Sequence, residues 1–361
     1  MSANIITFAF MERINWIDWG KFVCMTMVVF SHLPQHADSL ALRYCSSVVL
    51  ASFFFLSGYL KKPVSSIKTA LRKYWNTLLL PYLVYNLLFF PYWLARHLLE
   101  SSEPLTFTTC LKPFVGIVLP QLNSNFSCEM NGITWFLVAL FLMHLLTDLC
   151  QRLRHGGWLL GLCCVATIVL YGANKYWHYA PNLTYNGFVR CLTFYAMGYL
   201  FRQQGLWSSV RPWRDVLVAL LTLSLSIVIF YWHIHETRFV IHIVLFYVVN
   251  ILSVFGILGW CKAVSPLCSK PVVMVSTGTM VVMGLHPMMI GIVNFMLEHL
   301  LSVRPIFYTT SEALGLALAI EFVLLPVIAF CYRHCPLLLG KHSQRLLPWS
   351  WEQSCSKSAS H

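Results

Sequence analysis

The chain has 361 residues, of which 58% are hydrophobic and 11% are charged, and its mean hydropathy is +0.67. Soluble proteins carry about 25% charged and about 45–50% apolar residues, so this composition excludes a disordered chain, a nucleic-acid scaffold and an ordinary cytosolic enzyme. The net charge of +12 is explained in a membrane protein by cytoplasmic loops that face anionic headgroups. We therefore expect an all-α, polytopic membrane helical bundle whose surroundings are membrane lipids and not nucleic acid.

A scan for runs of about 17–25 mostly apolar residues predicts about ten transmembrane helices. The first is not a cleaved signal sequence, because Asp18 and Lys21 interrupt it and no small-residue cleavage site follows. We expect one membrane domain over residues 1–335 and a short cytoplasmic tail over residues 336–361. The predicted spans lie near residues 16–33, 44–60, 77–95, 133–150, 156–173, 185–201, 215–232, 239–260, 279–298 and 313–331.

The distribution of Lys and Arg predicts the orientation of these spans. With the N-terminus inside, the inner segments hold 17 of these residues and the outer loops hold 6. Inner loops are the ones that carry the excess of cations, so we expect both termini in the cytoplasm and the long loop, about residues 96–132, outside. Cys110 and Cys128 fall in that loop and either form a disulfide or stay free; no cysteine has metal-type spacing, so no metal is expected.

The first predicted span carries three polar side chains on one face. Lys21 and His32 are eleven residues apart, almost three helical turns, so they point the same way about 16 Å apart along the axis, and Asp18 joins that face. Such residues inside a span usually line a cavity or a substrate path. The alternative is that Asp18 and Lys21 pair at the inner interface, while His32 is an interfacial histidine before Pro34.

The loop between the second and third spans is unusually basic. It carries five cations and no acid: Lys61, Lys62, Lys68, Arg72 and Lys73. This cluster either binds a phosphorylated cytoplasmic ligand or reflects orientation and contact with lipid headgroups.

Three residues of later spans are further candidates. His286 precedes Pro287, which frees a backbone carbonyl and often kinks a helix; a helix–helix hydrogen bond is the alternative role for this histidine. Arg190 lies five residues into a span and needs a partner or a wet cavity. Trp135, taken alone, is typical of an interfacial anchor.

Two further patterns narrow the possibilities. The segment FFLSGYLKK from Phe54 is echoed by FYAMGYLFR from Phe194, which a small glycine for helix packing and a terminal cation explain without duplication. The chain has no phosphate-binding P-loop, no HExxH and no GxSxG. ATP-driven pumps and the common membrane hydrolases built on those motifs are therefore excluded.

Together these segments resemble the acyltransferase-three family of integral-membrane O-acyltransferases, and are most similar to the branch with fucose O-acetylases and related surface-glycan acetyltransferases. The matching segments run in order from about residue 12 to about residue 335: RINWIDWGKFVCMTMVVFSH, ASFFFLSGYLKK, ALRKYWNTLLLPY, ITWFLVALF, FYAMGYL and STGTMVVMGLHPMM. The family's hallmark is Arg or Lys, ten residues and then His, which Lys21 and His32 match. The resemblance implies that His32 is catalytic and that Lys21 supports it or the donor.

Other site residues follow from the same resemblance. Ser57 lies in the second-span signature, His286 corresponds to the late histidine, and Arg72 with Lys73 stands where the family keeps basic residues before a proline, here Pro81. The sequence departs from the family where a second arginine is expected, because Trp75, Asn76 and Thr77 occupy that stretch. The complete predicted site has His32, Lys21 and Asp18 as catalytic residues, Arg72, Lys73, Lys68 and Arg190 as donor-binding residues, and Trp135, His286 and Ser57 as substrate-binding residues.

The resemblance implies acetyl-CoA or another acyl-CoA as cosubstrate, a sugar hydroxyl on a cell-surface or lipid-linked glycan as acceptor, and a multi-pass location in the bacterial cytoplasmic (inner) membrane. His32 then acts as general base or carries the acyl group itself. The rival hypothesis is a transporter or flippase of glycans or lipid-linked intermediates, in which Asp18, Lys21, Arg190 and His286 line a polar path.

Overall fold

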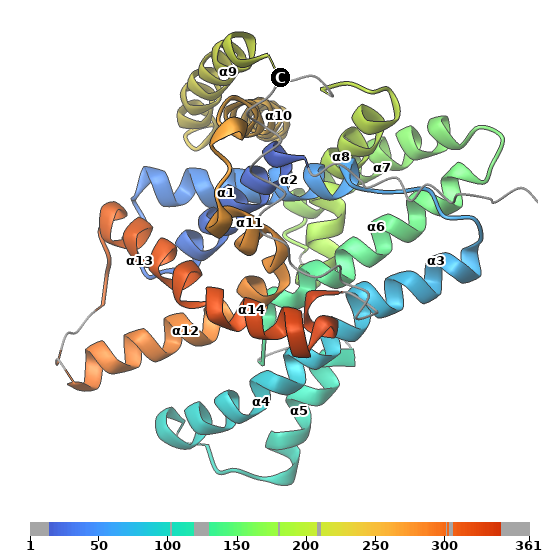
Figure 1. Cartoon of the computed structure of the whole chain (residues 1–361). Coiled ribbons are helices and arrows are strands. Elements are labelled where there is room, and N and C mark those ends of the chain that lie inside the picture. The colour runs from blue at the N-terminus through green and yellow to red at the C-terminus, as the bar shows by residue number, and fades with distance from the viewer. Residues whose placement is uncertain are drawn as a thin grey trace, which may run out of the picture.

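The structure is a computed structural model that describes residues 14–101, 103–118, 130–179, 181–207, 211–300, 302 and 306–340. In this part of the chain all the named secondary-structure elements are helices (Figure 1), and the expected all-α fold is confirmed. The α-helices are α1 (Asn15–His32), α2 (Leu40–Tyr59), α3 (Ile67–Tyr74), α4 (Leu80–Glu100), α5 (Phe107–Val118), α6 (Trp135–Gln151), α7 (Gly156–Tyr176), α8 (Leu183–Gln203), α9 (Pro212–His233), α10 (Phe239–Ala263), α11 (Lys270–Thr277), α12 (Thr279–Leu300), α13 (Thr310–Val323) and α14 (Leu325–His334).

Among the described residues, eight helical segments are long and apolar enough to cross a membrane. They match eight of the ten predicted spans, and the other two predicted spans are α1 and α8. Protein surrounds both of these helices: α1 packs on α2, α10, α11, α12 and α13, and α8 packs on α2, α6 and α7. A helix that contacts protein instead of lipid does not need apolar residues on every side, which explains why α1 and α8 carry charged groups. The count of ten and the inside–outside orientation stay predictions.

The segment boundaries differ from the predicted ones in three places. A π-helical turn joins α3 to α4, so this segment is helical from Ile67 to Glu100 and not only over 77–95. The predicted outer loop contains α5, a helix of twelve residues that is too short to be predicted as a span. Cys128 of the suggested disulfide lies outside the described residues. The packed chain continues beyond 335, since Tyr85 donates a hydrogen bond to the carbonyl of Leu338 (2.7 Å), and residues 341–361 of the predicted tail lie outside the described residues.

The helices α2 and α8 approach each other backbone to backbone. A Cβ on Gly58 would lie 2.0 Å from the carbonyl oxygen of Tyr195, and a Cβ on Gly198 would lie 2.0 Å from the carbonyl oxygen of Phe55. Only glycine allows such an approach, which is a recurrent way for membrane helices to pack. The two similar segments, FFLSGYLKK and FYAMGYLFR, therefore each supply one glycine to the same contact between α2 and α8.

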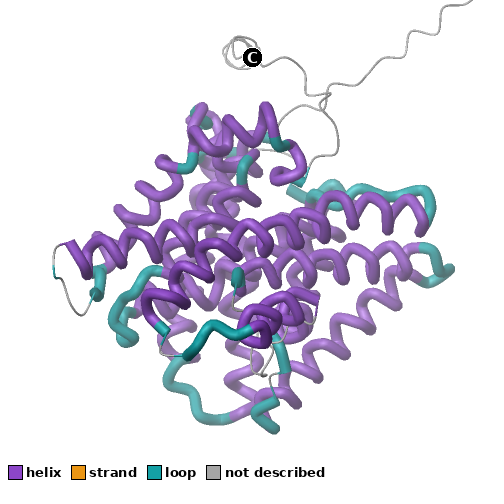
Figure 2. The backbone as a smooth tube through the Cα atoms, turned by 90° about the horizontal axis from the view of Figure 1, so that it is seen from below, coloured by secondary structure: helices purple, strands orange, loops and turns teal. Residues whose placement is uncertain are grey.

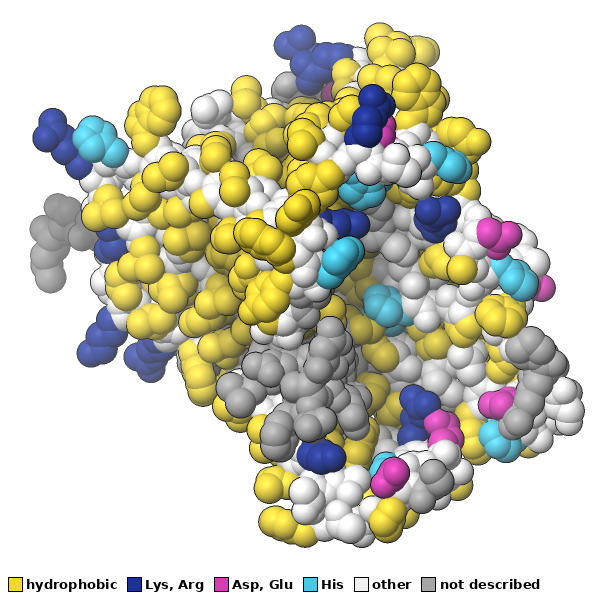
Figure 3. Space-filling view, turned by 180° about the vertical axis from the view of Figure 1, so that it is seen from behind, with side chains coloured by type: hydrophobic (Ala, Val, Ile, Leu, Met, Phe, Trp, Pro, Cys, Tyr) yellow, Lys and Arg dark blue, Asp and Glu magenta, His cyan; other side chains and the backbone are white. Residues whose placement is uncertain are grey.

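The outer surface of the bundle is strongly apolar. Helices lie side by side with mostly short connections (Figure 2), and large hydrophobic side chains are exposed along α7 and α9, among them Val169 and Trp213. Seen from behind, hydrophobic side chains cover a broad part of the surface (Figure 3). Surfaces of this extent are unfavourable in water but expected for helices that face lipid, as in a multi-pass membrane protein.

Candidate active site

A cavity of about 350 Å³ lies where α1 ends and α6 and α8 begin. Its wall is mainly apolar, and its polar side chains are those of Ser31, His32 and Ser46. Cavities of this size, with few polar groups on an apolar wall, are typical of small-molecule sites. The lining residues are Met25, Val28, Ser31, His32, Ser46, Val49, Leu50, Phe53, Ile133, Trp135, Phe136, Leu183 and Met283.

Two predicted site residues meet beside this cavity: His32 lines it, and His286, which is not a lining residue, packs against His32. The rings of His32 and His286 contact edge to face, with centroids 5.2 Å apart. Nδ1 of His32 lies 2.7 Å from the carbonyl oxygen of Val28, and Nδ1 of His286 lies 2.9 Å from that of Val282. A carbonyl oxygen only accepts, so each Nδ1 carries the hydrogen and each neutral ring keeps an acceptor lone pair on Nε2.

Prolines help to set the environment of both histidines. α1 ends at His32, because Pro34 disfavours helical backbone in the residue before it and Leu33 is extended. Pro287 has no amide hydrogen, so the carbonyl of Met283, a cavity residue, cannot receive its usual helical bond. His286 is fully buried and its Nε2 has no hydrogen-bond partner among the described residues, whereas the side chain of His32 is open to the cavity.

Trp135 is the third predicted residue at this cavity. Its ring packs on α8 where Gly187 leaves room, since a Cβ there would lie 1.9 Å from a ring carbon. The turn before it is held by two buried amides that sequence reasoning missed: Asn86 donates to Thr134 Oγ1 (2.9 Å) and Asn131 donates to the carbonyl of Gly284 (2.8 Å). Asparagines within apolar surroundings were the signal that could have revealed them.

Three of the predicted residues on α1 and α2, Asp18, Lys21 and Ser57, are not among the residues that line the cavity. Asp18 is buried near the other end of α1, where it accepts a hydrogen bond from Ser276 Oγ (2.5 Å). Lys21 is partly buried and lies about 16 Å along the helix axis from His32. The hydroxyl of Ser57 donates to the carbonyl of Phe53 (2.9 Å) within its own helix. The structure therefore brings His32, His286 and Trp135 together but leaves these three elsewhere.

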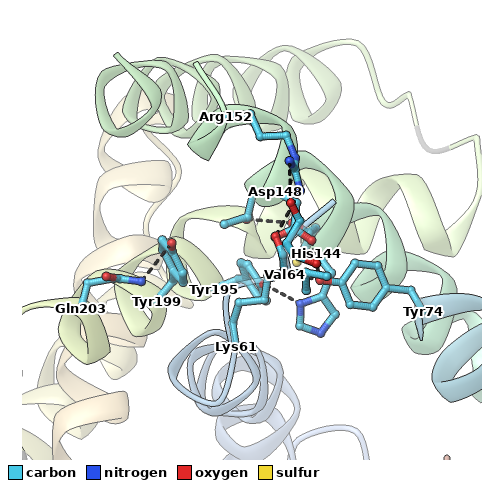
Figure 4. Close-up of polar contacts among 12 residues, drawn as sticks. Lys61, Val64, Tyr74, His144, Asp148, Arg152, Tyr195, Tyr199 and Gln203 are labelled. Carbon is cyan, nitrogen blue, oxygen red and sulfur yellow. Dashed lines mark hydrogen bonds and ion pairs between the residues drawn. The ribbon is translucent and has the colours of Figure 1, made fainter. Parts of the chain in front are cut away.

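The basic loop divides into two groups. Lys62, Lys68, Arg72 and Lys73 are exposed, but Lys61 is 5% exposed and pairs with Asp148 of α6, with Nζ and Oδ1 2.6 Å apart (Figure 4). Burial lowers the pKa of the Lys61 amine, while the Asp148 carboxylate acts in the opposite direction. Lys61 is therefore paired and buried and is not one of the exposed cations of this loop.

Other contacts from α6 anchor the same loop. Tyr74 Oη donates to Asp148 Oδ2 (2.5 Å) and contacts Lys61 Nζ, and its ring stacks on His144 at 5.0 Å between centroids. Arg152 donates to the carbonyls of Val64 (3.1 Å) and Ser65 (3.3 Å). Tyr74 is followed by the π-helical turn Trp75–Leu79, a geometry that is frequent at functional sites. The end of α6 thus fixes α3, which carries Lys68, Arg72 and Lys73.

Arg190 lies apart from the other predicted donor-binding residues. It lines a second cavity, of about 560 Å³, bounded by the end of α7, the start of α8, the end of α9 and the start of α10. Its guanidinium carbon is 4.7 Å from the ring centroid of Phe246, and Nη2 is 3.5 Å from the carbonyl oxygen of Ser47. No residue of α3 lines this cavity, so the structure does not join Arg190 to Arg72 and Lys73.

Comparison with known proteins gives one match. The sequence model of the acyltransferase-3 family, described as an acyltransferase domain, matches residues 14–332. No curated protein and no solved structure matches the chain.

Proposed function

Because the chain belongs to the acyltransferase-3 family, we propose that it moves an acetyl or other acyl group from acyl-CoA to a hydroxyl of a cell-surface or lipid-linked glycan. Family membership and eight apolar helices support an integral-membrane acyltransferase. Donor, acceptor and mechanism are the proposed part. The bacterial cytoplasmic membrane is the location that this proposal favours, since acyl-CoA and lipid-linked glycans are both accessible there.

The observation that carries the proposal is the position of His32 on the wall of the cavity. Its Nδ1–H donates to Val28, which leaves Nε2 as the atom that can take a proton. We assign it the role of general base: Nε2 removes the hydroxyl proton as the sugar oxygen attacks the thioester carbonyl, the carbon–sulfur bond breaks, and CoA leaves as the thiol after protonation by the same imidazole. In the alternative chemistry, Nε2 carries the acyl group before the sugar accepts it.

His286 fits a supporting role in this mechanism. Its Nε2 is buried and has no hydrogen-bond partner in the described part of the chain, and its ring contacts that of His32. When His32 has taken the proton it is an imidazolium, and a neutral His286 places no second positive charge beside it. Trp135 is part of the apolar wall of the cavity and fits a role in holding the acceptor.

The donor is proposed to bind from the side of α3. Lys68, Arg72 and Lys73 are exposed there, and guanidinium and ammonium groups bind phosphates by charge-assisted hydrogen bonds. The predicted orientation places these cations in the cytoplasm, where acyl-CoA is made. Lys21 lies on α1 about 16 Å along the helix axis from His32. A role in contacting the donor therefore suits Lys21 better than a role in contacting the imidazole of His32.

The test is thioester cleavage by the purified protein in detergent, followed as release of the CoA thiol with and without a glycan acceptor. We expect thiol release that depends on the acceptor, and an acceptor that gains one acyl ester per thiol released. The transporter hypothesis predicts the opposite pair of results: no thiol release, and movement of the glycan across the membrane of liposomes that contain the protein.

A further inference from the structure

The second cavity has the composition of an anion site. Two of its lining residues, Lys175 and Arg190, are cations. Two more are histidines in contact, His233 and His242, whose ring centroids are 4.1 Å apart. Among the described residues, no Asp or Glu lines it. Glu236, in the turn between α9 and α10, is paired with Arg238 at 2.9 Å. In the view from behind, histidine, Lys and Arg side chains gather around hollowed parts of the surface (Figure 3).

A buried atom in this cavity lacks a partner. His233 is 7% exposed, and its Nδ1 has no hydrogen-bond partner among the described residues. Buried polar groups are nearly always hydrogen-bonded, and this nitrogen beside the cavity is an exception among the described residues. The guanidinium of Arg190 makes one long hydrogen bond, 3.5 Å to Ser47, which leaves most of its five N–H groups for another acceptor.

The two cavities are neighbours along the same helices. Ser46 of α2 lines the His32 cavity and Ser47 lines the second one; on α8, Leu183 lines the first and Asn186 the second. A ligand bound at Arg190 therefore lies in the cavity next to the one that is lined by His32, the candidate catalytic base. The volume of about 560 Å³ is within the range of ligand pockets.

We propose that the second cavity binds the phosphate or diphosphate group of a lipid-linked saccharide acceptor and so directs the sugar toward His32. This inference rests on the proposed function and names the class of acceptor. Arg190 and Lys175 supply positive charge, and Asn186 supplies neutral donors, whereas the amide of Asn174 already donates to the hydroxyl of Tyr185 (3.3 Å). This set offers more donors than one carboxylate can accept, whereas a diphosphate has acceptor oxygens for all of them.

The binding test uses the full-length protein in detergent micelles with farnesyl diphosphate as the probe and farnesol as the uncharged control. We expect the diphosphate to bind more tightly than farnesol, and more weakly as salt is raised. Arg190→Gln should weaken diphosphate binding about tenfold or more, because it removes a hydrogen bond between charged groups. Lys175→Gln, at an exposed position where folding is not at risk, should weaken binding in the same direction.

The matched control is Arg238→Gln, which removes an exposed cation of the same end of the bundle that does not line the cavity; its binding should be unchanged. Equal affinities of the wild type and Arg190→Gln, or equal binding of farnesol, would overturn the proposal. The binding is also measured in nanodiscs of phosphatidylglycerol and of phosphatidylcholine. If the Arg190-dependent binding of the probe is lost only in phosphatidylglycerol, the natural ligand of the cavity is a lipid headgroup, and the proposal is overturned. His32→Ala should bind the probe normally, which separates this test from that of acyl transfer.

Discussion

The buried pair between Lys61 and Asp148 gives the sharpest stability prediction. The side chains of Lys61 and Asp148 are 2% and 7% exposed, and Asp148 also accepts a hydrogen bond from Tyr74. Asp148→Asn keeps the shape of the side chain but leaves the Lys61 amine without its counter-charge. Removing one partner of a buried ion pair costs about 3–5 kcal/mol, so we expect a loss of that size in the free energy of unfolding.

The assay is thermal unfolding of the purified protein in micelles. At about 2 °C per kcal/mol for a large domain, the midpoint should fall by about 6–10 °C. The matched control is Arg96→Gln, which breaks the pair with Glu100 on α4, where the side chains are 56% and 45% exposed; exposed pairs contribute about 0–1 kcal/mol.

A compensated variant separates charge from packing. In Lys61→Met with Asp148→Leu and Tyr74→Phe, no buried polar atom of the trio loses a partner, because all three are replaced, and such exchanges are often neutral or stabilising. We expect its midpoint to return to within a few degrees of the wild type. If Asp148→Asn and Arg96→Gln shift the midpoint equally, or if the compensated variant is as unstable as Asp148→Asn, the unpaired buried charge is not the cause of the lost stability.

Three further predictions concern packing, donor binding and topology. Gly198→Ala should lose about 1–3 kcal/mol or more of stability, because its Cβ would meet the backbone of α2, while Gly161→Ala on α7, with open space around it, should be tolerated; thermal unfolding measures both. The double variant Arg72→Ala, Lys73→Ala should raise the KM for acyl-CoA more than that for the glycan, with a smaller effect at high salt; an unchanged donor KM would mean that these cations bind headgroups only. Cysteine labelling of intact cells should reach the 96–132 loop from outside, and labelling only from the cytoplasm would contradict the predicted orientation.

Most of the helical architecture could be predicted because the bilayer imposes length and hydropathy on each span. His32 and His286 could be singled out for the same reason, since polar groups are costly among apolar residues, and the structure places them in contact. The match of eight segments to predicted spans reflects this local constraint. What the sequence does not reveal is the side of a helix that faces lipid, as the central positions of α1 and α8 illustrate.

The remaining differences between the sequence pattern and the structure have one physical origin, the contacts between distant segments. The sequence does not show that Lys61 is buried and paired, because its partner, Asp148, lies 87 residues away in the chain. Arg190 was grouped with Arg72 and Lys73 by charge, although the packing of α7 to α10 places it in a separate cavity. Periodicity indicates which residues share a face, but not which neighbour covers that face.

The most direct test of the central claim is the turnover of His32→Ala in the thiol-release assay, with His299→Ala as its matched control. His299 is an exposed histidine of α12 whose Nδ1 also donates to the carbonyl four residues back (3.0 Å), but it does not line the cavity. We expect His32→Ala to lose about 10²–10⁴-fold in kcat, with unchanged thermal unfolding, while His299→Ala keeps wild-type turnover. Retention of more than about a tenth of wild-type turnover by a folded His32→Ala protein would contradict the assignment of His32 as the base.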